Sequence, residues 1–147
     1  MKRGKYRNAV FIVVYAKSKN RIFYLILKRK LHWKGWEFPK GGKEKFEFSR
    51  TAVKRETKEE TGLIPLKIKK HNFRGKYNYH KRFKDRPGII GQKFILYSAQ
   101  IPKKKITFNK NEHSDYKWID FKTAIKKLTW SNQRKSLRIV NGHLNRS

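Results

Sequence analysis

The sequence predicts a mixed α/β fold in which helices cover a sheet. Strand-like segments come first, a helix follows, and the same order is then repeated by further strands and two helices. Hydrophobic residues make up 37% of the 147 residues and aromatic residues 14%, which is enough apolar material for one core at this length. The chain contains no internal repeat or linker, so we expect residues 1–147 to form a single domain.

The first part of the chain predicts two strands, a loop and a helix. Residues 7–15 and 22–28 are rich in Val, Ile, Phe and Tyr, and a polar turn separates them. Residues 31–48 are punctuated by glycine and proline, so we expect an irregular loop. A helix of about three turns follows, with Ser49 as its expected N-cap and Gly62 as its stop.

The middle of the chain returns to strands. Residues 63–73 alternate loosely between apolar and polar side chains, which predicts one strand or a pair of strands. Residues 76–91 are basic and aromatic and contain Pro and Gly, which favours a hairpin or an excursion. Residues 92–101 predict a strand, and residues 117–120 a short one.

Two helices are expected near the C-terminus. Asp120 can cap a helix over residues 121–128, and Ser131 can cap one over residues 132–144. Apolar residues recur at helical spacing in the second helix, at Leu137, Val140 and Leu144.

Positive charge dominates the composition. The chain has 40 Lys and Arg against 10 Asp and Glu, a formal net charge of +30, which excludes an ordinary neutral globule and favours a polyanionic partner. A general lysine bias of the organism is the alternative explanation. The chain has no Cys and therefore no thiolate metal site.

No segment predicts a membrane or secretory address. The longest apolar run, residues 9–16, is too short to span a bilayer, and no signal-peptide pattern follows the basic N-terminus. We therefore expect a cytoplasmic protein without a membrane partner. The sequence indicates no particular oligomeric state.

The scarce acids are concentrated, since six of the ten fall between positions 37 and 60. Glu56, Glu59 and Glu60 share one face of the predicted helix, and like charges at this spacing destabilise a helix by a few tenths of a kcal/mol per pair. A hard cation such as Mg²⁺ or Mn²⁺ would explain them, because such ions prefer oxygen ligands. The alternative is a solvated face paired with basic neighbours. For Glu37 and Glu44, relief of local Lys repulsion is an equal explanation.

The acids belong to a longer pattern that begins in the glycine-containing loop. From position 41 the chain reads GGKEKFEFSRTAVKRETKEETGL. Its defined positions follow one another at fixed gaps, in the order Gly41, five residues, Glu47, seven residues, Arg55, Glu56, Thr57, one residue, Glu59, Glu60, one residue, Gly62 and Leu63.

This pattern resembles the Nudix box, G-x5-E-x7-R-E-U-x-E-E-x-G-U with U a bulky aliphatic residue. Eight of its nine defined positions match. Thr57 departs from the aliphatic position, and Phe46 replaces the small Gly that commonly precedes the box Glu. Flanking segments are similar to those of the diadenosine tetraphosphate hydrolases and the bacterial RNA pyrophosphohydrolases, both Nudix subgroups.

The resemblance implies an α/β/α sandwich and hydrolysis of a phosphoanhydride that depends on Mg²⁺ or Mn²⁺. It implies metal ligands at Glu56, Glu59 and Glu60, with the Gly41 carbonyl as a further oxygen ligand. Arg55 would orient neighbouring carboxylates rather than contact the substrate.

Other roles are less closely fixed by the resemblance. Glu47 either reaches a metal ion or favours the helix N-terminus electrostatically. Glu112 matches the general base that approaches from a distant loop in the resembling subgroups, although it could be an ordinary loop acid. His113 is expected to be structural or a hydrogen-bond donor, and Trp118 and Trp130 to be core residues. Candidate substrate contacts are Lys40, Lys93 and Tyr77 or Tyr79 for phosphates, with one of these aromatics or Trp36 stacking on a base.

Three functions therefore compete. The leading hypothesis is an enzyme that cleaves a nucleoside polyphosphate, above all a dinucleoside tetraphosphate. An RNA 5′-pyrophosphohydrolase is the first alternative. A basic RNA-binding domain with a non-catalytic fold is the second, with residues 71–86 supplying phosphate contacts and stacking.

Overall fold

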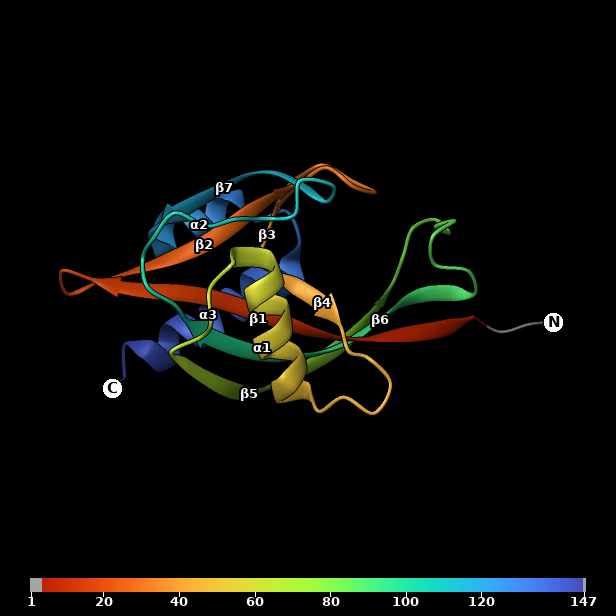
Figure 1. The fold of residues 1–147 in the computed structure, drawn as a ribbon, viewed down its shortest axis with the longest axis horizontal. Helices are drawn as coiled ribbons and strands as arrows, with labels where there is room; N and C mark the ends of the chain where they lie inside the picture. Colours follow the sequence, from red (N-terminus) through yellow and green to blue (C-terminus); the bar gives the residue numbers. More distant parts are fainter. Residues whose placement is uncertain (1–3, 147) are drawn as a thin grey trace.

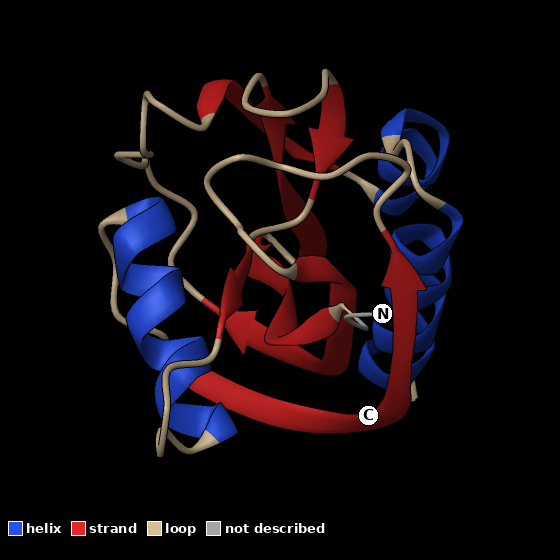
Figure 2. Ribbon diagram, turned by 90° about the vertical axis from the view of Figure 1, so that its right-hand side faces the viewer, coloured by secondary structure: helices blue, strands red, loops and turns tan. Residues whose placement is uncertain are grey.

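A computed structural model describes residues 4–146, in which a seven-stranded mixed sheet separates two layers of helices (Figure 1). Figure 2 shows one helix on one side of the sheet and the remaining helices on the other. The predicted mixed α/β class is therefore confirmed. The elements are β1 (Lys5–Ser18), β2 (Arg21–Arg29), β3 (Gly35–Glu37), β4 (Lys40–Gly42), α1 (Ser49–Thr61), β5 (Lys67–Asn78), β6 (Ile89–Gln100), β7 (His113–Ile119), α2 (Phe121–Lys127) and α3 (Ser131–Leu144).

Strand β1 forms the centre of the core because both of its faces are buried. Val10, Ile12 and Val14 pack in a cluster with Ala52 and Val53 of α1. The intervening side chains of β1 pack in a second cluster with α2 and α3. Alternation along one β-branched strand thus supplies apolar groups to both layers, each fully buried side chain contributing about 1.5–3 kcal/mol.

Strands β1 and β2 diverge, so the sheet splits on that side of β1. β1 runs parallel to β6 along most of its length, and β6 pairs antiparallel with β5. β1 pairs with β2 over Tyr15–Ser18, whereas Ala9–Phe11 pair with the short strand β4. β2 continues away between β3 and β7. This divergence leaves room for β4, which pairs with β1 and contacts α1, where the acidic motif lies.

Two predictions about the first part of the chain were wrong. Residues 31–48 are not wholly irregular, since β3 and β4 lie within them. Strands of three residues that contain glycine carry no alternating apolar pattern, so no sequence pattern indicates them. Ser49 is the first residue of α1 rather than its cap, because Phe48 holds the extended capping conformation and no side chain caps the helix.

The later elements follow the predictions with shifted boundaries. Residues 79–88 connect β5 to β6, which confirms the hairpin, and Asp120 caps α2 by accepting a hydrogen bond from the Thr123 N–H. Ser131 is the first residue of α3, and Trp130 is the extended residue before it, so that predicted cap was wrong. Within the described residues no helix is long and apolar enough to cross a membrane.

Candidate active site

Helix α1 places its three carboxylates in two environments. Glu56 and Glu60, one turn apart, lie on the buried face with 7% and 5% of their surface exposed, whereas Glu59 is exposed. The helix ends where predicted, since Gly62 takes a left-handed conformation (φ 77°) and its N–H donates to the Lys58 carbonyl. A solvated face therefore does not explain Glu56 and Glu60.

Gly41 of β4 lies directly against the Glu56 side chain. A Cβ atom at this position would overlap the Glu56 carboxylate, so no larger residue fits without displacing it. Pairing of Gly41 with Val10 of β1 fixes the main chain of β4 at this place. The glycine of the motif thus brings peptide groups close to a buried carboxylate.

Arg55 organises the acids around it. Its Nε and Nη2 atoms donate to the two Glu47 carboxylate oxygens at 2.9 and 2.8 Å, and Nη2 also donates to the Gly42 carbonyl at 2.9 Å. Its Nη1 donates to Glu56 Oε1 at 2.8 Å, with Glu59 oxygens at 3.4 Å. The hydrogen bonds that Arg55 donates to Glu47 lower the pKa of Glu47 to about 2. Arg55 therefore joins the loop, β4 and the acidic helix face in one geometry.

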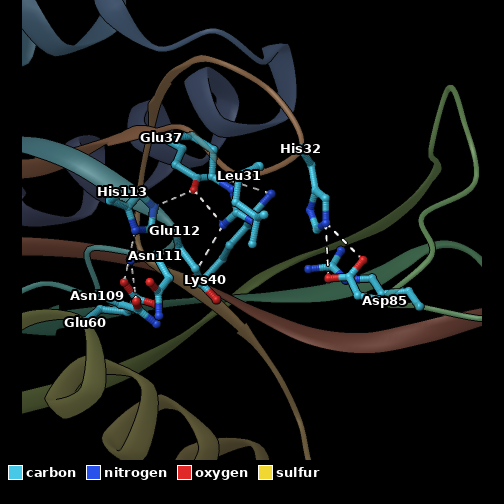
Figure 3. A network of polar contacts seen from close by, with 12 residues as sticks. Leu31, His32, Glu37, Lys40, Glu60, Asp85, Asn109, Asn111, Glu112 and His113 are labelled. Carbon is cyan, nitrogen blue, oxygen red and sulfur yellow. Dashed lines mark hydrogen bonds and ion pairs between the residues drawn. The ribbon is translucent and has the colours of Figure 1, made fainter.

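A buried histidine, His113, connects Glu37 of β3 to Glu60 of α1 (Figure 3). His113 Nε2 lies 2.8 Å from Glu37 Oε2, and its Nδ1 lies 3.4 Å from Glu60 Oε2. Glu112, the preceding residue, has a carboxylate oxygen within 4.8 Å of ligand atoms of Glu60 and His113. The main chain of this turn is held in place, since the Glu112 carbonyl accepts hydrogen bonds from the Lys30 and Leu31 N–H groups.

Glu37 is a structural member of this network and not a surface acid that relieves Lys repulsion. Arg29 Nη1 lies 3.3 Å from one of its oxygens and Lys40 Nζ lies 3.3 Å from the other. Burial alone would raise the pKa of Glu37, but Lys40, His113 and Arg29 hold it at about 2. Its charge therefore fixes the positions of the basic groups beside the site.

In the two inner carboxylates of α1 the effect of burial on the pKa prevails, in contrast to Glu37. Burial raises the pKa of Glu56 to about 7, against the hydrogen bond from Arg55. Burial, followed by the charges of Glu112 and Glu56, raises the pKa of Glu60 as well. Oε2 of Glu60 has no hydrogen-bond partner among the described residues although it is buried. A cation bound beside these carboxylates would favour their ionised forms.

The donor set fits a hard divalent cation. Carboxylate oxygens of Glu56, Glu59, Glu60 and Glu112 line one cavity of about 130 Å³ together with Gly41. Oxygen donors and the absence of Cys suit Mg²⁺ or Mn²⁺. The full lining of this carboxylate cavity is Arg7, Arg29, Lys40, Gly41, Glu56, Glu59, Glu60, Arg86, Gln92, Asn109 and Glu112.

Basic side chains also line the carboxylate cavity. Arg7, Arg29 and Arg86 were missed in the sequence because nothing distinguishes them among 40 basic residues. Burial, together with the nearby guanidinium of Arg86, lowers the pKa of Arg7. The cavity thus brings carboxylates and crowded cations together, an arrangement suited to a metal-bound polyanion.

An aromatic pocket of about 260 Å³ adjoins the carboxylate cavity. Arg86 crosses its wall, donating from Nη1 to the Tyr79 hydroxyl at 2.7 Å and lying over the Phe83 ring. His32 stacks on Phe83 with ring centroids 4.1 Å apart. The lining of the pocket is Phe11, Arg29, His32, Trp33, Lys40, Tyr77, Asn78, Tyr79, His80, Phe83, Arg86, Trp130, Ser131, Asn132 and Gln133.

The structure brings some of the predicted substrate contacts together and separates others. Lys40, Tyr77 and Tyr79 line the aromatic pocket. Lys93 does not, because strand alternation directs it into a separate groove on the opposite face of β6 from Gln92.

The tryptophans also divide. Trp36 packs against the core with Lys117 and Lys127 beside its ring, away from the pocket. Trp118 packs against the other cluster, as a core residue should. Trp130 is 37% exposed and lines the aromatic pocket, so its assignment to the core was wrong.

The family follows from comparison of the sequence with known domains. A model of the NUDIX domain family matches residues 5–138. The chain therefore belongs to the Nudix family and is a Nudix hydrolase, a class of enzymes that generally uses divalent metal ions. It is 32% identical over 128 residues to an RNA pyrophosphohydrolase of Hydrogenovibrio crunogenus, covering 79% of this chain and 74% of that protein.

Solved structures show the same fold. A C. elegans Ap4A hydrolase in a binary complex superimposes with a TM-score of 0.76 at 23% identity, covering 96% of this chain and 99% of that one. The E. coli dihydroneopterin triphosphate pyrophosphohydrolase gives a TM-score of 0.75 at 22% identity, covering 92% and 98%. At these identities the likeness concerns the architecture.

Proposed function

We propose that the protein hydrolyses a phosphoanhydride bond of a nucleoside polyphosphate, with a dinucleoside tetraphosphate as its substrate. The observation that carries this proposal is the junction of the aromatic pocket and the carboxylate cavity. Arg29, Lys40 and Arg86 line both. A base in the pocket would therefore have its phosphate chain directed across three cations toward the acidic face of α1.

The aromatic pocket suits a nucleobase because aromatic side chains dominate its lining. Tyr79 and Phe83 are neighbours there, with ring centroids 4.9 Å apart, and Trp33 and Trp130 meet edge to face at 5.1 Å. Stacking on such rings contributes about 1–3 kcal/mol per base. A terminal adenosine of a dinucleoside polyphosphate supplies the base and the phosphates in one ligand.

In this proposal Glu56, Glu59 and Glu60, with the Gly41 carbonyl, hold Mg²⁺ or Mn²⁺. The bound cation would neutralise phosphate charge and lower the pKa of coordinated water. Arg55 keeps Glu56 and Glu47 in place, and Arg29 and Lys40 bind phosphate oxygens. Glu112, at the cavity rim and near Arg29, is assigned as the acceptor of the proton from the attacking water.

A 5′-triphosphorylated RNA is the second candidate substrate. The relative from Hydrogenovibrio crunogenus, an RNA pyrophosphohydrolase, supports it, as does the net charge of +30. The structural neighbour from C. elegans, an Ap4A hydrolase, supports the dinucleotide. Both substrates present a base followed by a polyphosphate, so both fit the same junction.

The test compares the two substrates directly. Purified protein is incubated with diadenosine tetraphosphate and with a 5′-triphosphorylated oligonucleotide in Mg²⁺ and in Mn²⁺, and kcat/KM is measured for each by product chromatography. We expect turnover of the dinucleotide to ATP and AMP with the higher kcat/KM. A higher kcat/KM for the RNA would favour the second candidate. Absence of product from both, with Glu60→Gln indistinguishable from the parent, would overturn the proposed activity.

A further inference from the structure

A basic groove of about 360 Å³ lies outside the site described above. It is formed by β1, β5 and β6 and by the segment that precedes α1. Lys43, Arg74, Lys76 and Lys93 line it, and no carboxylate does. Within residues 4–146 none of these four side chains forms an ion pair, although other basic residues of the chain do. The groove therefore concentrates positive charge without a carboxylate in its lining.

The arrangement of the basic groove works against the stability of the sheet. Lys76 of β5 is the direct cross-strand partner of Lys93 of β6, and like charges at such positions are destabilising. Both ammonium groups lie over the ring of Tyr6, at 4.9 and 5.9 Å from its centre, and Arg74 lies two residues before Lys76 on β5. A polyanion along the groove would turn this repulsion into attraction.

Two exposed phenylalanines stand in the adjoining segment, residues 43–48. Phe46 is 92% exposed and Phe48 80%, so neither contributes to the core. Phe46 also takes a left-handed conformation (φ 65°), which side chains of this size rarely adopt. Lys45 places its ammonium group 5.3 Å from the Phe46 ring centre. The segment thus presents rings and positive charge to solvent, and its first residue, Lys43, lines the groove.

We propose that the basic groove and Phe46 and Phe48 bind single-stranded polynucleotide, the groove following the phosphodiester backbone and the rings stacking on bases. Positive grooves joined to exposed aromatic rings are the general means of binding single strands without sequence preference. The groove and the active site use residues that are neighbours in the sequence. Gly42, Arg7 and Gln92 lie by the site, and the residues next to them line the groove, namely Lys43, Asn8 and Lys93. The surface would hold the body of an RNA whose 5′ end enters the site.

The surface rests on the second candidate substrate of the proposed function, but its test does not require catalysis. A fluorescent 5′-hydroxyl oligonucleotide of about 12 nucleotides has no phosphoanhydride to cleave. Its binding is measured by anisotropy against salt concentration. Arg74→Ala combined with Lys76→Ala should weaken binding and reduce the slope of log K against log salt by about 1.4, because about 0.7 is lost for each single-strand phosphate contact.

The aromatic part is tested with Phe46→Gly, which removes the ring and suits the left-handed backbone. We expect binding to weaken about tenfold with little change in the salt slope. Lys122→Ala combined with Lys126→Ala is the matched control, since it removes two exposed positive charges from α2 on the other side of the sheet. Circular dichroism and thermal melting check that every variant is folded.

Two results would overturn the proposal. One is an Arg74/Lys76 variant that binds no more weakly than the Lys122/Lys126 control. The other is polyglutamate competing as well as the oligonucleotide, with no effect of Phe46→Gly, which would indicate a surface for acidic protein. Hydrolysis of diadenosine tetraphosphate by the same variants should equal that of the parent. Loss of oligonucleotide binding with hydrolysis intact thus separates this surface from the proposed activity.

Discussion

Glu56→Gln should stabilise the metal-free protein at alkaline pH while it removes a proposed metal ligand. Glu56 is buried, and burial raises its pKa from 4.5 to about 7. Ionising Glu56 therefore costs more free energy in the folded state than in the unfolded state, so it lowers the stability of the folded protein. The neutral amide has nearly the same shape and can still accept a hydrogen bond from Arg55, which lies 2.8 Å away.

The pH dependence has a definite sign. Because the folded pKa lies above the unfolded one, the protonated side chain favours folding fully below about pH 4.5, and this advantage is lost as the pH rises through about 7. The difference corresponds to about 3 kcal/mol as an upper bound, or roughly 6–12 °C in Tm for a chain of this size. Parent and variant should therefore melt together near pH 4.5 and separate above pH 7.

The assay is thermal and urea unfolding in EDTA across this pH range, repeated with Mg²⁺. Mg²⁺ should raise the Tm of the parent and not that of Glu56→Gln, since a bound ion stabilises only the state that holds it. Glu59→Gln is the matched control, because Glu59 is exposed on the same helix and its neutralisation should change stability by less than about 0.5 kcal/mol. Equal or lower stability of Glu56→Gln at alkaline pH in EDTA would refute the reasoning.

Three further predictions concern the site. Gly41→Ala should reduce kcat on the order of 100-fold with the fold retained by circular dichroism, because the methyl group displaces the Glu56 carboxylate; an active variant would contradict the close packing. Arg55→Lys should reduce kcat about 10–100-fold, since an ammonium group cannot hold both Glu47 oxygens and Glu56 together; steady-state kinetics with unchanged kcat would disprove this role. Phe83→Ala should raise KM for diadenosine tetraphosphate about tenfold with little effect on kcat, and an unchanged KM would show that the base binds elsewhere.

The acidic motif could be located from the sequence because its chemistry is local. Gly41, Glu47, Arg55 and the acids of α1 lie within one loop and one helix, so spacing alone determines that they meet. Periodicity likewise predicted the long strands and the buried face of α3, with Leu137, Val140 and Leu144 all buried. These features depend on neighbours a few residues apart.

The rest of the site depends on contacts between distant segments. His113 meets Glu37 and Glu60 only because β7 pairs with β2, and no sequence pattern joins those positions. Of the three cations shared by the two cavities, only Lys40 was selected from the sequence, since Arg29 and Arg86 resemble many other basic residues until the fold places them. Lys93 was predicted to contact phosphates because the sequence does not show which face of β6 it occupies. That face depends on the pairing register of β6.

The central claim is that the acidic face of α1 catalyses hydrolysis of a nucleoside polyphosphate. The most direct test measures kcat on diadenosine tetraphosphate in Mg²⁺ for the parent, Glu56→Gln and Asp115→Asn. The last variant neutralises an exposed acid of β7 and serves as the charge-matched control. We predict that Glu56→Gln loses on the order of 10³-fold, equivalent to about 4 kcal/mol of transition-state stabilisation, while Asp115→Asn keeps the parent rate. Equal rates for all three proteins would contradict the claim.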